Sequence, residues 1–353
     1  LLVMQIPVGL MFDRIGARRT VSGLSILAVV GAVLLARADG PASHLFARLV
    51  VGIGCAASFM SAVFLVSRWF PPAQLSTSLS WVFAASNVGT LIAATPLAWA
   101  SATVGWRNGF LVLAAVTAIA AVLFYLLVRD LPPGMPSPGN AKETPGAVFR
   151  GLAEVCKTPG LVPILAMHTF AYAVMLTVLG VWAGPYLHAV HGLDSIARGH
   201  VMLGMGLAQI IGILCYGPID RILGSRKKVV VIGVIATTLV LAALAALNRP
   251  PLSLAVGLLV ALTFFAAYGI VIVAQGRSLF PAHLAGRGVT TVNMAQVLGC
   301  MALPAASGYV VTALAAPDGT TPEAAFRTVF GLLAVCNLAG LAVYLRSPDS
   351  KPA

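Results

Sequence analysis

Long apolar runs separated by short polar turns make up most of the sequence. A partial run covers residues 1–11, and fuller runs follow at 20–36, 45–66, 75–98 and 109–128. After a stretch rich in Pro, Gly and charge at 129–160, further runs cover 161–186, 199–218, 229–247, 252–274, 288–315 and 324–345. A helix of about 20 residues crosses a bilayer, and no run alternates as barrel strands do. The pattern therefore predicts an all-α polytopic membrane protein.

Composition and charge agree with this class. The chain is 59% hydrophobic and only 9% charged, whereas soluble domains carry about 25% charged residues. The formal net charge of +12 does not indicate nucleic acid, because Lys and Arg stand singly or in short groups between apolar runs. With Arg19 placed in the cytoplasm, alternating spans put most of the basic residues on that side, as the positive-inside rule requires. The linker and the C-terminal tail are then expected in the cytoplasm.

One charged turn occurs twice, as GLMFDRIGARR at 9–19 and as GPIDRILGSRK at 217–227. This turn resembles the G-x-x-x-D-R-x-G-R-R/K loop of the major facilitator superfamily, which lies between helices two and three and returns more loosely between helices eight and nine. The motif residues are Gly9, Asp13, Arg14, Gly16, Arg18 and Arg19 in the first copy, and Asp220, Arg221, Gly224 and Arg226 in the second.

The resemblance implies the facilitator fold, with two pseudo-symmetric six-helix bundles. On this reading residues 1–128 form a partial N-terminal bundle (helices 2–6), 129–160 the cytoplasmic linker, 161–346 the C-terminal bundle (helices 7–12) and 347–353 the tail. We expect that the first helix and part of the second precede Leu1. The motifs do not assign a subfamily.

Asp13 needs a partner, because it follows an apolar helix whose C-terminal end carries partial negative charge. Nearby Arg14, Arg18 or Arg19 can supply one, as can the positive N-terminus of a helix from the other half of the chain. The family resemblance implies the contact between halves. The turn is therefore expected to act as a conformational latch and topology anchor, with the second copy as a weaker counterpart.

Arg48 opens the segment RLVVGIGCAA, which resembles the family's second motif, R-x-x-x-G-x-G-A-A. A buried guanidinium is costly, so Arg48 is expected either to face a cavity or to snorkel to the outer headgroups. The resemblance implies a part in proton coupling. All ten acidic residues fall in loops or at span ends. The proton carrier is therefore expected either in the first helix, which we expect before Leu1, or at His168. The alternative is that Arg48 attracts an anionic substrate.

The seventh helix carries two further groups of candidates. His168 lies about one third of the way into its span, and Tyr172 follows on the same face. Histidine exchanges protons near neutral pH, but a neutral histidine bonded to a carbonyl is an equal alternative. At the outer end, Gly184 and Pro185 are expected to break or kink the helix and make a gate with Trp182 and Tyr186 as lids; the alternative is an interfacial aromatic belt.

Polar side chains within apolar spans are candidates for lining a central cavity, although each can equally bond one helix to another. They are Asn87, Gln209, Tyr268, Gln275, Asn293 and Gln296. In the fifth helix, ASNVGTLIAA stands in the place of the antiporter motif G-x-x-x-G-P-x-x-G-G and lacks its proline. This departure disfavours proton-driven drug efflux.

These features predict a secondary transporter that works by alternating access and takes up a small organic anion with a proton. Its expected partners are the substrate and the lipid bilayer, not nucleic acid, and we expect a monomer in a bacterial inner membrane. We expect no catalytic residue, metal or organic cofactor, with the proton as coupling ion. The alternatives are an exporter or exchanger of a neutral, drug-like solute and, from another class, a transporter-like sensor or membrane-embedded enzyme.

Overall fold

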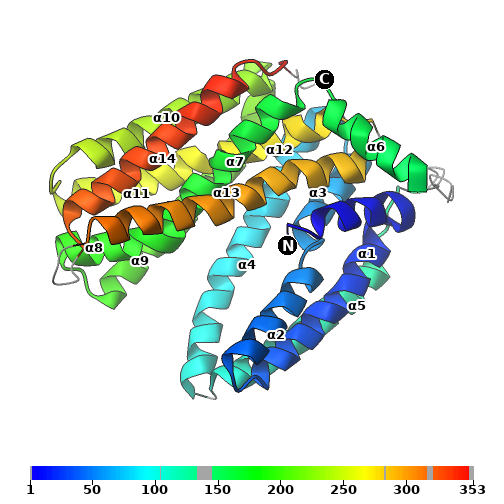
Figure 1. Cartoon of the computed structure of the whole chain (residues 1–353), viewed down its shortest axis with the longest axis horizontal. Coiled ribbons are helices and arrows are strands. Elements are labelled where there is room, and N and C mark those ends of the chain that lie inside the picture. The colour runs from blue at the N-terminus through cyan, green and yellow to red at the C-terminus, as the bar shows by residue number, and fades with distance from the viewer. Residues whose placement is uncertain (1, 104, 133–144, 282–283, 316–320, 350–353) are drawn as a thin grey trace. The chain divides into compact units, whose positions relative to one another are not determined.

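The computed structural model describes residues 2–103, 105–132, 145–281, 284–315 and 321–349, with the side chains of 72, 90–103, 145–149 and 152 left aside. All regular elements in these ranges are helices (Figure 1). In chain order they are α1 (Gln5–Ala36), α2 (Pro41–Gly54), α3 (Ser58–Trp69), η1 (Pro72–Gln74), α4 (Leu75–Thr103), α5 (Trp106–Leu127), α6 (Pro145–Lys157), α7 (Leu161–Thr177), η2 (Val178–Trp182), α8 (Ala183–His191), α9 (Ser195–Leu223), α10 (Arg226–Ala246), α11 (Leu252–Phe265), η3 (Ala266–Tyr268), α12 (Gly269–Ser278), α13 (Ala285–Ala313) and α14 (Glu323–Tyr344).

The helices follow the apolar runs of the sequence. Within the described residues, nine helical segments are long and apolar enough to cross a bilayer. Several of them are interrupted helices, so α2 continues into α3, α7 into α8 through η2, and α11 into α12 through η3. The prediction of an all-α polytopic membrane protein is confirmed.

The described chain forms two compact units, and each takes one segment from the other half of the sequence. Unit 1 comprises residues 1–71, 88–158 and 279–294, and unit 2 comprises 72–87, 159–278 and 295–353. The first turns of α13 therefore belong to unit 1, and the first turns of α4 belong to unit 2. The division into two bundles predicted from chain order does not include this exchange.

In unit 1, α1 is bent where two separate spans were predicted. Gly16 interrupts its helical backbone with φ of 82°, a conformation that glycine adopts without penalty. A Cβ at Gly16 would also overlap the Asp130 carboxylate. Gly16 therefore provides both the backbone conformation and the space for Asp130.

A close helix crossing holds α1 against α2. A Cβ at Gly54 would overlap the backbone of Ala28, and a Cβ at Gly31 would lie 2.6 Å from the Val51 amide nitrogen. Gly52, which lies two residues before Gly54 on α2, has no neighbouring heavy atom within 4 Å of such a Cβ. The close approach therefore depends on Gly54 and Gly31, as is common for small residues in membrane helices.

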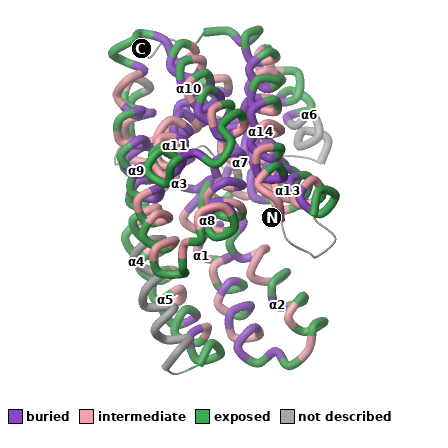
Figure 2. Tube along the Cα trace, turned by 90° about the vertical axis from the view of Figure 1, so that its left-hand side faces the viewer, coloured by how far each residue is buried: buried purple, intermediate pink, exposed green. Residues whose placement is uncertain are grey.

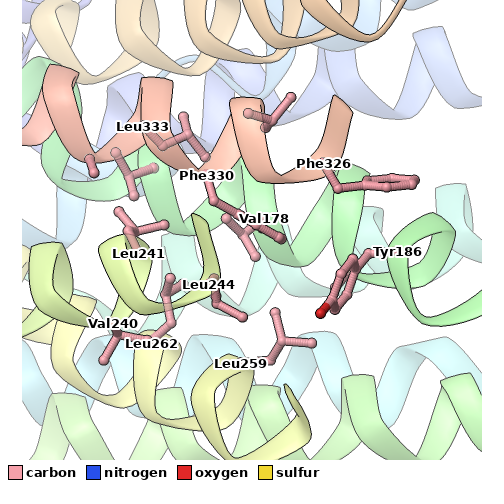
Figure 3. Close-up of a cluster of buried hydrophobic side chains, with 14 of the residues drawn as sticks. Val178, Tyr186, Val240, Leu241, Leu244, Leu259, Leu262, Phe326, Phe330 and Leu333 are labelled. Atoms are coloured by element: carbon pink, nitrogen blue, oxygen red, sulfur yellow. The ribbon is translucent and has the colours of Figure 1, made fainter. Parts of the chain in front are cut away.

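Unit 2 has an apolar core between α7, α8, α10, α11 and α14 (Figure 3). Leu241, Leu259 and Phe330 are buried there. Along α10, buried and exposed positions alternate with the helical period (Figure 2), and the exposed ones include Ile232 and Leu239. An apolar outer face of this kind suits lipid rather than water.

The seventh transmembrane segment is irregular one turn before the predicted break. Val178–Trp182 form a π-helical turn, and Gly184 and Pro185 lie in the first turn of α8, which continues from it. Proline has no N–H to close the preceding turn, so a widened turn on its N-terminal side satisfies the backbone with little loss. The helix axis continues through Gly184 and Pro185 instead of ending there.

Candidate functional site

Asp13 binds the N-terminus of α13, within unit 1. Its Oδ1 accepts a hydrogen bond from the Gly286 amide at 2.8 Å, and its Oδ2 accepts one from the Arg287 amide at 3.2 Å. The Arg287 Nε lies 3.4 Å from the same Oδ2. The sequence allowed two kinds of partner for Asp13, a nearby arginine or the N-terminus of a helix from the other half of the chain. In the structure the partner is the N-terminus of α13, from the second half. The positive end of α13 and a buried guanidinium both stabilise this carboxylate.

Glycines make the approach of α1 to α13 possible. A Cβ at Gly9 would overlap the Thr290 hydroxyl and would lie 3.1 Å from the Arg287 Cα. A Cβ at Gly286 would lie 2.5 Å from Asp13 Oδ1 and 2.6 Å from the Gly9 carbonyl oxygen. The motif glycine and the motif aspartate therefore serve one contact.

The basic residues of the first turn bind elsewhere in unit 1. The Arg18 amide donates to Asp130 Oδ1 at 2.9 Å, its Nε donates to the Tyr125 carbonyl at 2.5 Å, and its guanidinium lies over the Tyr125 ring. Arg14 and Arg19 are exposed. The turn is thus joined to the segment after α5 by Arg18 and to α13 by Asp13.

The second copy of the turn binds the N-terminus of α4, within unit 2. Asp220 Oδ2 accepts a hydrogen bond from the Ser76 hydroxyl, and the Arg226 Nε lies 3.2 Å from the same oxygen. Arg221 donates to the Thr77 hydroxyl at 3.0 Å. Gly224 ends α9 in the left-handed conformation, with φ of 61°. This copy therefore joins α9 to α4 through side-chain hydroxyls.

The two contacts repeat each other along the chain. Gly217 stands against Ser80 of α4 as Gly9 stands against Thr290 of α13. The two contacts differ in their donors. Asp13 accepts hydrogen bonds from two backbone amides in the second half of the sequence. Asp220 accepts a hydrogen bond from one hydroxyl in the first half and pairs with an arginine of its own loop. The second contact is therefore the weaker connection between halves.

Arg48 lies on α2 of unit 1 with its side chain exposed. It forms no hydrogen bond or ion pair with the residues that the structure describes, and its neighbours Leu45 and Leu49 are also exposed. The side chain is thus placed on an uncovered side of the helix, which fits both expectations for it, a watery cavity and snorkelling to the headgroups.

His168 is fully buried in unit 2, at 1% exposure. Neither ring nitrogen has a hydrogen-bond partner among the described residues, although the side chain of Gln296 on α13 lies beside the ring. Tyr172, one turn further along α7, is half-buried near Cys300. The structure therefore brings together His168, Tyr172 and Gln296 out of the predicted candidates.

Two other polar candidates connect helices of unit 2. The Tyr268 hydroxyl donates to Asn337 Oδ1 at 3.0 Å, and the Asn337 amide group donates to the Thr238 hydroxyl at 3.0 Å. Gln275 donates to the Pro348 carbonyl at 3.1 Å and also binds the Tyr344 hydroxyl. These contacts favour the helix-bonding alternative for Tyr268 and Gln275.

Three polar candidates remain, one on each of α9, α4 and α13. Gln209 is buried on α9, and Asn87 on α4 donates to the Phe83 carbonyl of its own helix at 2.8 Å. Asn293 is buried in the part of α13 that belongs to unit 1.

The predicted gate residues pack into the end of the unit 2 core. The Trp182 indole donates to the Ser307 hydroxyl at 2.8 Å, and the Tyr186 ring makes edge contacts with Phe326 and Phe330 (Figure 3). Tyr186 is buried and Pro185 is exposed. Tyr186 thus holds α8 against α14, and any gating movement has to carry this aromatic group with it.

Some functional positions were missed from the sequence. Arg287, Ser76 and Asn337 complete the contacts of Asp13, Asp220 and Tyr268. Asn337 is an amide within an apolar run, the same signal that selected Gln209. No local signal marks Arg287 or Ser76, because their partners are far away in the sequence.

The apolar helices define an integral, multi-pass membrane protein. The chain belongs to the major facilitator superfamily, whose sequence profile matches residues 1–304 and 169–353. The family expected from the repeated turn is thereby confirmed.

Several named proteins are similar in sequence. The transcription regulatory protein OpdE of Pseudomonas aeruginosa is 25% identical over 58% of this chain and 48% of its own length. The D-galactonate transporter of Escherichia coli O6:H1 is 23% identical over 87% of this chain and 76% of its own. The 3-(3-hydroxy-phenyl)propionate transporter of Escherichia coli K12 is 27% identical over 96% and 79%. The matched part of the chain thus spans about half the length of the first of these relatives.

Solved structures share the fold. The fucose:proton symporter FucP of Escherichia coli, solved as a single-residue variant, superposes with a TM-score of 0.76 at 13% identity, covering 98% of this chain and 88% of that one. The human organic anion transporter MFSD10 superposes with a TM-score of 0.74 at 17% identity, covering 96% and 80%. At these identities the likeness concerns the fold alone.

Proposed function

We propose that the protein is a secondary transporter that takes up a small organic anion together with a proton and works by alternating access. The observation that carries the choice of cargo is the distribution of charge. In the sequence, all ten acidic residues fall in loops or at the ends of the predicted spans, whereas Arg48 stands within a span without a described partner. A pathway with a cation and no fixed carboxylate has positive potential and concentrates anions.

The names of two relatives support this cargo. D-galactonate and 3-(3-hydroxyphenyl)propionate, which are the substrates in the names of these transporters, are both carboxylates at neutral pH. They differ greatly in polarity, so the carboxylate is the group they share. We therefore propose a carboxylate as the recognised group and Arg48 as the residue that attracts it.

The two loop contacts support alternating access as the mechanism. Each joins an aspartate to the first turn of a helix from the other half of the chain, through Asp13 on α13 and Asp220 on α4. A contact of this kind can form in one conformation and break in the other, and the substrate shifts the balance by binding the two differently. On the topology given by the positive-inside rule, both contacts lie on the cytoplasmic side, together with the linker and the C-terminus. We place the protein in a bacterial inner membrane, as a monomer.

Uptake by proteoliposomes containing the purified protein tests this proposal. Radiolabelled D-galactonate and 3-(3-hydroxyphenyl)propionate are offered with and without an outside-acid pH gradient, beside their neutral amide analogues. We expect the carboxylates to be taken up, the amides to be excluded, and the gradient to drive accumulation. Uptake of the amides or of cations in preference to carboxylates would overturn the choice of cargo.

The role of Arg48 is tested in the same assay. Arg48→Ala should reduce carboxylate uptake by about tenfold or more, because a charge-assisted hydrogen bond contributes about 1.5–3 kcal/mol. Arg37→Ala is the matched control, since Arg37 is exposed just beyond the end of α1 on the same predicted side. Equal uptake by the two variants would remove Arg48 from the pathway.

A further inference from the structure

His168 lies on the side of α7 that faces away from α14. A Cβ at Gly340 of α14 would lie 2.8 Å from the Phe170 ring and 3.4 Å from the Ala166 carbonyl oxygen, so these two residues mark the α14 side. At about 3.6 residues per turn, His168 and Tyr172 lie on roughly the opposite side. The helix thus packs by one face and presents its two polar side chains on the other.

Helix α13 crosses α7 closely beside this polar face. A Cβ at Gly299 would overlap the Thr169 carbonyl oxygen and would lie 3.0 Å from the Ala173 Cβ. Gln296, one turn before Gly299, is brought beside the His168 ring. The crossing therefore fixes a carboxamide next to the imidazole while both are withdrawn from solvent.

The imidazole of His168 has unused hydrogen-bonding capacity. Both ring nitrogens are buried without a hydrogen-bond partner among the described residues. A neutral imidazole has one donor and one acceptor, and burying either without a partner is unfavourable. Such a side chain is costly to keep unless another state of the protein, or a ligand, satisfies it.

The described surroundings of His168 hold no fixed negative charge. Besides Tyr172 of α7 itself, the elements η3, α12 and α13 that pack against this helix carry these titratable side chains: Tyr268, Arg277, Arg287, Cys300 and Tyr309. On α14, against the other side of α7, the carboxylate is that of Glu323 in the first turn, which pairs with Arg249 at 3.3 Å. A proton added to His168 would therefore be an unpaired buried charge.

From this arrangement we infer that His168 and Gln296 form the site where the transported proton and the substrate carboxylate bind together. The inference rests on the proposed uptake of an organic anion with a proton. The proton adds to the free lone pair of one ring nitrogen, and no covalent bond breaks. The carboxylate accepts a hydrogen bond from the resulting imidazolium and one from the Gln296 amide group. Each charge neutralises the other, so neither binds well alone.

Because the site is buried, binding of the proton and binding of the carboxylate depend on each other. An imidazolium without its anion is disfavoured by desolvation, and an anion without the imidazolium lacks its counter-charge. The two ligands therefore raise each other's affinity by the same factor. Affinity for the carboxylate should increase as the pH falls, because protonated His168 is the form that binds it.

His168→Gln tests the site in proteoliposomes with labelled D-galactonate and 3-(3-hydroxyphenyl)propionate as probes. Glutamine retains a hydrogen-bond donor but carries no transportable proton. We expect accumulation driven by a pH gradient to fall about tenfold or more, and the weaker carboxylate affinity that remains to be independent of pH between about pH 8 and pH 6. His200→Gln, an exposed histidine of α9 in the same unit, is the matched control.

Gln296→Glu supplies a second test that does not remove the histidine. A carboxylate fixed beside His168 acts as a permanent counter-ion, so the histidine is protonated without substrate. Between about pH 8 and pH 6, wild-type affinity for the carboxylate should rise about fivefold or more, whereas that of Gln296→Glu should change less than about twofold.

These experiments distinguish a failure of the proposed transport function from a failure of the proposed site at His168 and Gln296. If the wild-type protein moves neither carboxylate, the proposed function fails and this site fails with it. If the wild-type protein accumulates them with protons and His168→Gln does so equally, the function stands and the site is wrong. An unchanged pH dependence of binding in Gln296→Glu would also overturn the site.

Discussion

Replacing Asp13 by Asn should slow transport with little effect on substrate binding. The carboxylate accepts amides from Gly286 and Arg287 and pairs with the Arg287 guanidinium, and both side chains are nearly buried, at 7% and 2% exposure. Asparagine has the same shape, but only one acceptor oxygen. The variant therefore keeps one of the hydrogen bonds and turns an NH₂ group towards the remaining donors.

The expected decrease in transport rate can be estimated from the hydrogen bond and the ion pair that Asp13→Asn removes. A hydrogen bond to a charged group contributes about 1.5–3 kcal/mol, and removing one partner of a buried ion pair leaves the other uncompensated. A loss of about 3 kcal/mol corresponds to roughly a 100-fold shift in the balance between latched and unlatched conformations, at about 1.4 kcal/mol for each tenfold. If the latched conformation is a required step, the maximal uptake rate should fall about tenfold or more.

The assay compares initial uptake rates with substrate dissociation constants measured by equilibrium binding. Asp39→Asn is the matched control, because Asp39 also pairs with an arginine of unit 1, Arg107 at 3.0 Å, but is 88% exposed. Exposed pairs contribute little, so this control should transport normally. A dissociation constant that rises tenfold in Asp13→Asn at an unchanged maximal rate would refute the latch and make Asp13 a substrate ligand.

Two further variants test the packing and the polar network. Gly54→Ala should lower the free energy of unfolding by about 1–3 kcal/mol, because its Cβ would overlap the Ala28 backbone, whereas Gly52→Ala has open space; equal thermal stability of the two variants would contradict the close crossing. Tyr268→Phe leaves the buried Asn337 oxygen without its donor and should cost about 1–3 kcal/mol in chemical denaturation while uptake stays near normal. Loss of uptake at full stability would instead make Tyr268 a substrate contact.

The sequence predicts the helical segments well because membrane spans are marked by composition alone. Each apolar run corresponds to a helix, and the Pro- and Gly-rich stretch at 129–160 ends one series of spans and precedes the next. The sequence predicts an interruption of the seventh helix near Gly184 and Pro185, but neither its exact place nor the interruption in the preceding half of the chain. The π-helical turn at Val178–Trp182 and the interruption between α2 and α3 lie in continuous apolar sequence, where a local change in backbone hydrogen bonding leaves no signature in hydrophobicity.

The candidate site is predictable in its chemistry but not in its pairing. The position of Asp13 at the end of a helix calls for a positive partner, and the sequence allowed a helix N-terminus from the other half. Nothing local identifies Gly286 and Arg287 as that partner, since the contact depends on how distant segments pack. Polar residues in apolar spans formed one group in the sequence, and the structure separates Tyr268 and Gln275, which bond to residues of other elements, from Gln296, which lies beside His168.

Proton symport of the carboxylate is tested most directly by measuring whether protons enter together with the substrate. Proteoliposomes containing the wild-type protein are loaded with a pH-sensitive dye and given an external carboxylate without an imposed gradient, while label uptake and lumenal pH are followed together. We expect the lumen to acidify as the carboxylate enters, and we expect neither label uptake nor acidification with the amide analogue. Entry of the carboxylate with no change in lumenal pH would contradict proton symport.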